Sequence, residues 1–319
     1  MKGEKKCNVA WSANFFCRLL AALLAVAALF CFCSCDEVID EVFNGLNFAY
    51  GTNAPDTAPN GGELDIYCID VGQGDASLLI SPEGKTMLID AGDTYAEEVV
   101  IDFLEQKGID KIDVVVATHP HSDHVGSMAA VIEHFGAVTM YTPDVSYQTK
   151  TYTNLIKTAE DCGTTIEYAW SGMLIPWSDS CVVTVLAPVE GCEYSLADMN
   201  EWSIILRVQY GRNSMIFTGD AETHSEQLAM FNNEADLFDA DVLKVGHHGS
   251  STSTCDGFLD AVSPRYAVIS VGDNNKYGHP HKETVEKLAR AGVVMLRTDE
   301  DGSIKITMTG NNITVVSCN

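Results

Sequence analysis

Short β-rich runs that alternate with helical patterns are the feature that most restricts the fold of this chain. From about residue 63 onward, runs rich in Val, Ile, Leu and Tyr are separated by segments with apolar residues at helical spacing. The predicted strands are 64–70, 76–80, 86–90, 113–118, 164–169, 181–187, 203–210, 213–217, 241–246, 266–271, 293–297, 303–308 and 312–316. The predicted helices are 94–107, 125–135, 150–160, 221–232, 254–261 and 282–291. Because most helices follow a strand closely, the pattern predicts mixed sheets covered by helices, an α/β architecture in one domain over residues 63–319.

The first 35 residues have a different character. Basic residues precede an apolar run from Leu19 to Phe32, which is the layout of a secretory signal. This run is shorter than the roughly 20 residues that a membrane-spanning helix needs. Ser34 followed by Cys35 resembles a bacterial lipoprotein processing site, although the cysteines here can also be ordinary apolar residues. We expect a signal peptide over 1–35 with Cys35 as the lipidated residue, a flexible linker over 36–62, and a domain anchored to the membrane in the cell envelope, outside the cytoplasm.

The chain is strongly acidic. It contains 45 Asp and Glu against 19 Lys and Arg, a net charge of −26. Since residues 1–35 hold four Lys or Arg and one Glu, their removal changes the net charge to −29. Such a protein repels nucleic acid at long range, so a polyanion would need a local basic groove. The candidates for this groove are Arg207, Arg212, Lys244, Lys276 and Lys282. Six cysteines follow residue 35, which permits disulfides but is too few for a disulfide framework.

The stretch A-T-H-P-H-S-D-H-V-G-S, residues 117–127, contains three of the nine histidines of the chain. It follows a predicted strand, and Pro120 favours an extended backbone at His119. Because residues two apart in an extended segment point the same way, His119 and His121 should converge. Asp123 and His124 then fall on the turn into the next helix. One short loop can therefore supply four nitrogen and oxygen ligands of the kind that zinc and neighbouring metals prefer.

The H-P-H-S-D-H motif resembles the metal-binding signature of the metallo-β-lactamase superfamily. The resemblance implies an αββα four-layer sandwich whose ligands lie on loops at one edge, and a further acidic ligand between two metal ions. Asp220, in S-M-I-F-T-G-D, fits that bridging role because it directly follows a predicted strand. The last histidine ligand is expected in L-K-V-G-H-H-G-S. His247, the first residue after the strand, is assigned to the second ion, and His248 to substrate contact or proton transfer, with the reverse order left open.

Further motifs look like the C-terminal domain of ComEC-type competence proteins, over about residues 62–318. They are D-V-G-Q-G-D-A from Asp70, I-D-A-G from Ile89, N-E-W-S-I-I-L-R-V-Q-Y-G from Asn200 and V-I-S-V-G-D-N-N-K-Y-G-H-P-H near the C-terminus. The resemblance implies that Asp90 orients a ligand histidine. Asn200 stands roughly where the superfamily has a third histidine for the first ion. His279 could compensate as a ligand or serve as the general acid.

Together these residues predict a metal-dependent hydrolase that needs no catalytic Ser or Cys. The expected cofactor is zinc, with two ions, and manganese is the alternative. Asp123 would orient the attacking hydroxide, and His248 or His279 would protonate the leaving group. Lys244, Ser250 and Ser251, near a predicted helix start, favour a phosphodiester substrate, such as DNA outside the membrane. The alternatives are a small lactone or amide substrate, or a lipid-anchored binding protein that retains metal without turnover. No protein partner is inferred.

Overall fold

The structure is a computed structural model, and it describes residues 61–318. The predicted signal peptide and linker lie outside the described residues, apart from residues 61 and 62. The strands are β1 (Leu64–Cys68), β2 (Ala76–Ile80), β3 (Thr86–Ala91), β4 (Ile112–Val116), β5 (Ala137–Thr142), β6 (Thr165–Tyr168), β7 (Cys181–Ala187), β8 (Ile205–Tyr210), β9 (Asn213–Phe217), β10 (Val242–Lys244), β11 (Tyr266–Ile269), β12 (Val294–Arg297), β13 (Ser303–Met308) and β14 (Ile313–Cys318). The α-helices are α3 (Glu97–Gln106), α4 (Ser122–Val125), α5 (Met128–Phe135), α6 (Lys150–Asp161), α7 (Thr223–Asn232), α8 (Asp256–Val262), α9 (Lys282–Arg290) and α10 (Thr298–Asp301).

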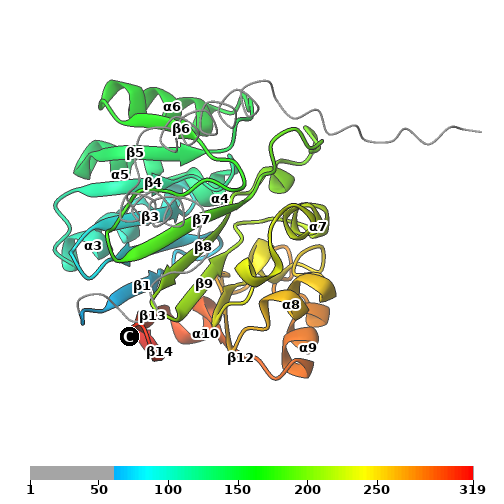
Figure 1. The fold of residues 1–319 in the computed structure, drawn as a ribbon. Helices are drawn as coiled ribbons and strands as arrows, with labels where there is room; N and C mark the ends of the chain where they lie inside the picture. The colour runs from blue at the N-terminus through cyan, green and yellow to red at the C-terminus, as the bar shows by residue number, and fades with distance from the viewer. Residues whose placement is uncertain (1–60, 319) are drawn as a thin grey trace, which may run out of the picture. The chain divides into compact units, whose positions relative to one another are not determined.

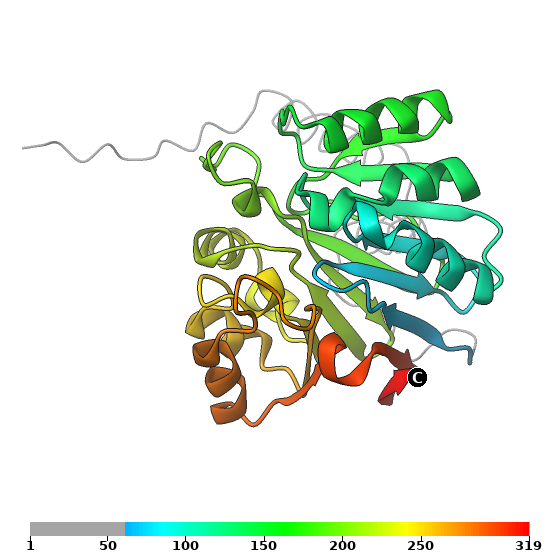
Figure 2. The same cartoon turned by 180° about the vertical axis from the view of Figure 1, so that it is seen from behind.

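Two mixed sheets form the centre of the described domain (Figure 1). The first sheet has eight strands in the order β14-β13-β1-β2-β3-β4-β5-β6, and β3 to β6 run parallel. The second has six strands in the order β12-β11-β10-β9-β8-β7. Helices α3, α5 and α6 cover the outer face of the first sheet, which Figure 2 shows from behind, and α7, α8 and α9 cover the second. This is the predicted αββα sandwich.

Alternation along the strands explains how one sheet serves two cores. In β1, Leu64, Ile66 and Cys68 are buried between the two sheets, whereas Tyr67 faces the other way and packs edge-on against Phe103 of α3. The β4 strand repeats this arrangement, because Val114 and Val116 join the inter-sheet core and Val115 joins the core under the helices. Each such fully buried side chain contributes about 1.5–3 kcal/mol.

The observed elements differ from the prediction in a few places. β5 (Ala137–Thr142) was not predicted, because its short run follows α5 directly at Gly136 and its polar threonines obscure the apolar pattern. The helix predicted over 125–135 is two helices, α4 and α5, with a break at Gly126 and Ser127. Cys68 and Cys181 are buried free thiols, so these two form no disulfide.

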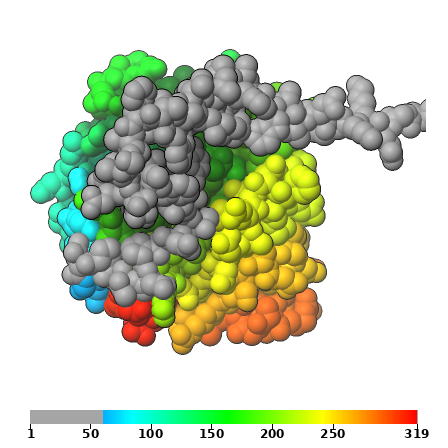
Figure 3. Space-filling model, in the orientation of Figure 1, coloured from blue at the N-terminus to red at the C-terminus, as the bar shows by residue number. Residues whose placement is uncertain are grey.

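Parallel strands bring the loops that carry chemistry to one edge. The segments after β3, β4, β9, β10 and β11 all leave the carboxyl ends of parallel or adjacent strands. In Figure 3, the later part of the described chain, yellow to orange, gathers on one side of the visible face and the cyan to green part on the other.

Within residues 61–318, no helix has the length and apolar character required to cross a membrane.

Candidate metal centre

The loop after β4 brings two imidazoles together. His119 is fully buried and His121 is extended (φ −69, ψ 148) as the cap of α4. Their ring nitrogens Nε2 and Nδ1 lie 3.0 Å apart, so the alternation predicted from the sequence places both rings at one point. The Thr118 hydroxyl donates to Asp90 at 2.7 Å, which leaves its oxygen to accept from His119 Nδ1 at 3.2 Å. His119 Nε2 therefore keeps its lone pair for a ligand.

Asp220 lies at the centre of the site. It follows β9 after Thr218-Gly219, is 2% exposed, and its N–H donates to Ser203 Oγ at 3.1 Å. Its Oδ1 is 3.1 Å from His124 Nε2, and its Oδ2 is 3.9 Å from His119 Nε2. Gly219 (φ +49) permits this approach, because a Cβ there would lie 2.8 Å from Thr118 Oγ1. The carboxylate thus stands between two groups of imidazoles, as a bridging ligand would.

Asp90 orients His124, in line with the expectation from the sequence. Its carboxylate accepts from Thr118 N–H at 2.9 Å and lies 2.7 Å from His124 Nδ1. A carboxylate can only accept, so the proton of the His124 ring sits on Nδ1 and the lone pair of Nε2 faces Asp220. Asp90 has φ 58, a backbone conformation in which Asp and Asn are the common non-glycine residues.

His247 and His248 occupy places opposite to those assigned from the sequence. His248 is 1% exposed, its Nδ1 donates to the Ser270 carbonyl at 2.9 Å, and its Nε2 lies 3.3 Å from Asp123 Oδ2. It therefore lies with Asp123, His124 and Asp220 in one group of potential metal ligands. His247 is partly exposed and faces Asn200 and Glu222. This geometry favours His248 over His247 as the ligand beside Asp123 and His124, which is the order left open in the sequence analysis.

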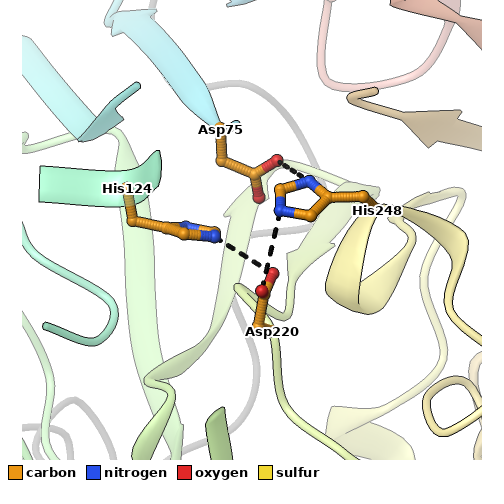
Figure 4. Close-up of side chains that lie close together, drawn as sticks. All are labelled: Asp75, His124, Asp220 and His248. Carbon is orange, nitrogen blue, oxygen red and sulfur yellow. Dashed lines mark ion pairs between the residues drawn. The ribbon is translucent and has the colours of Figure 1, made fainter. Parts of the chain in front are cut away.

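Asp75, from the D-V-G-Q-G-D-A motif, was not predicted as a site residue. Asp75, His124, Asp220 and His248 are buried and offer ligand atoms within 4.8 Å of one another (Figure 4). Asp75 Oδ1, however, lies 3.3 Å from His248 Nδ1, the nitrogen on the side of the ring away from Asp220, and its Oδ2 pairs with Lys244 at 2.7 Å. Since one imidazole cannot bind a single ion through both nitrogens, Asp75 supports His248 from behind.

The loop that carries Asp75 packs tightly on the histidine loop. Asp75 N–H donates to the Asp123 carbonyl at 3.1 Å, and a Cβ on Gly74 would lie 2.4 Å from that same oxygen. Two closely spaced glycines before an Asp were the only sequence signal of this contact. Burial raises the pKa of Asp75, but Lys244 and His248 outweigh it and lower the pKa to about 2. Asp75 is therefore ionised whenever the domain is folded near neutral pH.

The three residues predicted to contact substrate are not among the residues that line the cavity at the metal centre. Lys244 is 2% exposed and paired with Asp75, so the prediction that it binds substrate is wrong. Ser250 is buried and bonds to Thr252 at 2.9 Å, and Ser251 donates its N–H to His281 at 2.9 Å. The backbone N–H groups at the start of α8, which were expected to bind an anion, are taken by the buried Glu226, which accepts from Thr254 and Cys255. A carboxylate of the protein fills that place.

A cavity of about 410 Å³ opens onto the site. Its lining residues are Gln73, Pro120, His121, Ser122, Asp123, Tyr147, Thr149, Thr151, Asn200, Asp220, His247, His248, Tyr277 and His279. His279 packs edge-on against His247 with ring centroids 5.3 Å apart and stacks on Tyr277. Burial and the neighbouring His247 lower the pKa of His279 to about 4, so its ring is neutral at pH 7. It forms part of the cavity wall beside His247.

Buried atoms without partners test whether a metal fits. Within the described residues, His124 Nε2, Asp220 Oδ1 and His248 Nε2 are buried and make no hydrogen bond. Such atoms are costly unless something satisfies them, and a cation would satisfy all three. Burial lowers the pKa of His248, yet Asp220, Asp123 and Asp75 raise it to about 10. The carboxylates thus draw positive charge to this point, and the nitrogen and oxygen donors suit zinc or manganese.

Comparisons with known proteins agree with this geometry. Residues 69–151 match the profile described as "Metallo-beta-lactamase superfamily". The chain is 34% identical over 261 residues to "ComE operon protein 3" of Bacillus subtilis (strain 168), covering 76% of this chain and 33% of that protein. It is 30% identical over 246 residues to "Recombination protein 2" of Haemophilus influenzae, covering 76% and 28%. The chain therefore spans about a third of the length of these curated relatives.

A solved structure shares the fold. Igni18, described as a novel metallo hydrolase from the archaeon Ignicoccus hospitalis, superposes with a TM-score of 0.50 at 14% identity, covering 80% of this chain and 100% of that one. The sandwich, the loop motif and the sequence relatives lead to one assignment. Over residues 69–151 the chain matches the metallo-β-lactamase superfamily, and over 76% of its length it resembles a part of the ComEC-type competence proteins.

Proposed function

We propose that this protein is a metal-dependent hydrolase of phosphodiesters that acts on DNA outside the cytoplasmic membrane. The observation that carries the proposal is the set of buried, unpartnered ligand atoms around Asp220 at the floor of the cavity. Two ions at such a site lower the pKa of a water toward 7 and stabilise the attacking and leaving oxygens of an ester displacement. Zinc is the expected metal and manganese the alternative.

The residues divide into two groups on either side of Asp220. His119 and His121 would hold the first ion, while Asp123, His124 and His248 would hold the second. Asp90 and the Ser270 carbonyl fix His124 and His248 in the tautomers that leave Nε2 free. This assigns His248 to the metal, so the role of proton donor passes to His279. Its neutral ring lines the cavity and can donate an N–H to a departing oxygen.

The cavity attracts an anion only through the ions. Its described lining contains carboxylates, histidines and hydroxyls but no Lys or Arg. With a chain charge of −26, long-range steering opposes DNA, so the phosphate must be captured at the metal centre itself. Tyr147 and Tyr277 at the wall offer aromatic faces on which a base can stack. These features favour a flexible single strand over a duplex.

The relatives support the class of substrate. Their printed names include "Recombination protein 2" and "Competence protein ComA" of Neisseria gonorrhoeae, and recombination is a process that acts on DNA. We place the protein in the cell envelope, anchored through a lipid on Cys35. A small lactone or amide remains the alternative substrate. A second candidate, a binding protein that retains metal without turnover, is favoured by Asn200, which stands where the superfamily offers a third histidine.

One experiment separates these functions. Metal content and hydrolysis of bis-p-nitrophenyl phosphate and labelled single-stranded DNA are measured for the wild type, His121→Ala and Asp220→Ala. His134→Ala serves as the matched control, because His134 is exposed on α5 and pairs with Glu105 at 3.0 Å. We expect turnover in the wild type and the control and its loss in both site variants. Bound metal without hydrolysis of esters, DNA or lactones would identify the binding protein instead.

A further inference from the structure

The neighbouring residues His247 and His248 lie on different sides of one carboxylate oxygen. His248 Nε2 is 3.6 Å and His247 Nε2 is 3.7 Å from Asp220 Oδ2, while their ring centroids are 6.2 Å apart. Both residues have a left-handed backbone, with φ 49 at His247 and φ 53 at His248. For a residue other than glycine this conformation costs about 1–2 kcal/mol. Two such residues in succession at a buried carboxylate indicate that both rings are needed there.

Glu222 fixes the tautomer of His247. Its Oε1 lies 3.1 Å from His247 Nδ1 and accepts from the Thr252 hydroxyl at 2.9 Å. Because the carboxylate only accepts, the His247 proton sits on Nδ1 and the lone pair of Nε2 is left on the side of Asp220. The pair Glu222–His247 therefore repeats the pair Asp90–His124, which supports the second group of ligands. A carboxylate behind an imidazole is the usual support of a metal ligand.

Asn200 adds an independent observation at the same point. Its Oδ1 is buried and has no hydrogen-bond partner among the described residues. Its Nδ2 is 3.4 Å from both ring nitrogens of His247, so the amide lies against the ring without directing a bond at Nε2 alone. Asn200 and His247 both line the cavity beside His121. A cation next to His247 would satisfy this oxygen.

We propose that His247 Nε2 is the third imidazole ligand of the first ion, beside His119 and His121, and that Glu222 is the positioning residue for its ring. Adjacent ligands of an ion with bonds of about 2.1 Å stand roughly 3.4 Å apart in tetrahedral geometry, close to the separations from Asp220 Oδ2. The chain thus replaces the histidine missing at position 200 with one from the loop after β10. The inference rests on the metal site of the proposed function and not on its substrate.

The test measures metal binding without any substrate. Metal-free full-length protein is titrated with Co²⁺ alone, and the visible absorption and the bound metal per chain are recorded. We expect two ions in the wild type and in the control His134→Ala, and one ion in His247→Ala. Glu222→Ala should weaken the first ion by about 10- to 100-fold, and Glu222→Gln, which keeps an oxygen acceptor for Nδ1–H, should restore most of that loss.

Circular dichroism shows whether each variant is folded. Two ions with wild-type affinity in folded His247→Ala would overturn the proposal, as would the loss of both ions together. If His247→Ala does not fold, equal affinities in Glu222→Ala and Glu222→Gln would overturn it instead. A wild type that binds two ions through His247 yet hydrolyses no ester would reject the proposed function and keep this inference.

Discussion

Replacing Asp90 by Asn should weaken metal binding while leaving the backbone intact. Asn tolerates φ 58 as well as Asp does, so the variant isolates the side chain. Its amide oxygen can still accept from Thr118 N–H, now 2.9 Å from Asp90 Oδ1. Its NH₂ group, however, replaces the oxygen that lies 2.7 Å from both the Thr118 hydroxyl and His124 Nδ1.

The expected magnitude follows from the tautomer of His124. An NH₂ facing Nδ1 favours the ring form with the proton on Nε2, where it points at Asp220 and blocks a cation. Loss of such a carboxylate support costs about 10- to 100-fold in metal affinity, which corresponds to about 1.4–2.7 kcal/mol. One of the two ions should be affected, the one at Asp123, His124 and His248.

Competition with a chelator of known affinity measures the change. The matched control is Asp113→Asn, because Asp113 accepts from Thr86 N–H at 2.9 Å near the start of β4, at the end of the strand opposite to the histidine loop. The control should bind metal as the wild type does. Unchanged affinity in Asp90→Asn would refute the argument that Asp90 sets the tautomer of His124.

Three further predictions concern stability. Gly74→Ala should lower the thermal midpoint by several degrees and disturb metal binding, because its Cβ would lie 2.4 Å from the Asp123 carbonyl oxygen. The control is Gly84→Ala, since Gly84 also has a positive φ but no atom would lie within 4 Å of its Cβ. Equal shifts of the thermal midpoint in the two variants would contradict the steric argument. Lys244→Met leaves Asp75 buried without its partner and should lower the free energy of unfolding in urea by about 3–5 kcal/mol. Adding Asp75→Asn to the same chain should restore most of this free energy. A Lys244→Met variant as stable as the wild type would be inconsistent with this pairing. Burial raises the pKa of Glu226 from 4.5 to about 7, so the folded state holds its proton more tightly than the unfolded state. The raised pKa of Glu226 contributes about 3 kcal/mol to the free energy of unfolding below pH 4.5, and this contribution is lost as the pH rises through 7. The free energy of unfolding, measured from pH 5 to 8, should therefore fall with pH in the wild type and lack this fall in Glu226→Gln.

Local signals sufficed for the residues that lie next to one another in the chain. The alternation H-P-H after an apolar strand predicts that His119 and His121 meet, since strand geometry alone decides which way they point. The T-G-D segment likewise places Asp220 at a strand end. The αββα sandwich was expected from the resemblance of these motifs, and the order of strands and helices agreed with it.

Contacts between distant segments could not be derived in the same way. The roles of His247 and His248 depend on their two left-handed backbone conformations, which the residue types at these positions do not predict. Asp75 reaches the site only because its loop packs on the histidine loop. Lys244 was expected to contact substrate, but it is buried and paired with Asp75. Each of these errors concerns a partner that the linear sequence does not identify.

The pairing of β1 with β13 has a consequence for how the domain reaches its native state. Asp65 stands opposite Thr307, so the first strand of the described domain finds one of its two neighbours only near the other end of the chain. A nascent chain that stops before β13 leaves β1 with an open edge that other chains can join. Such long-range closure slows folding, and β1 keeps that open edge until the last hairpin, β13 and β14, has formed.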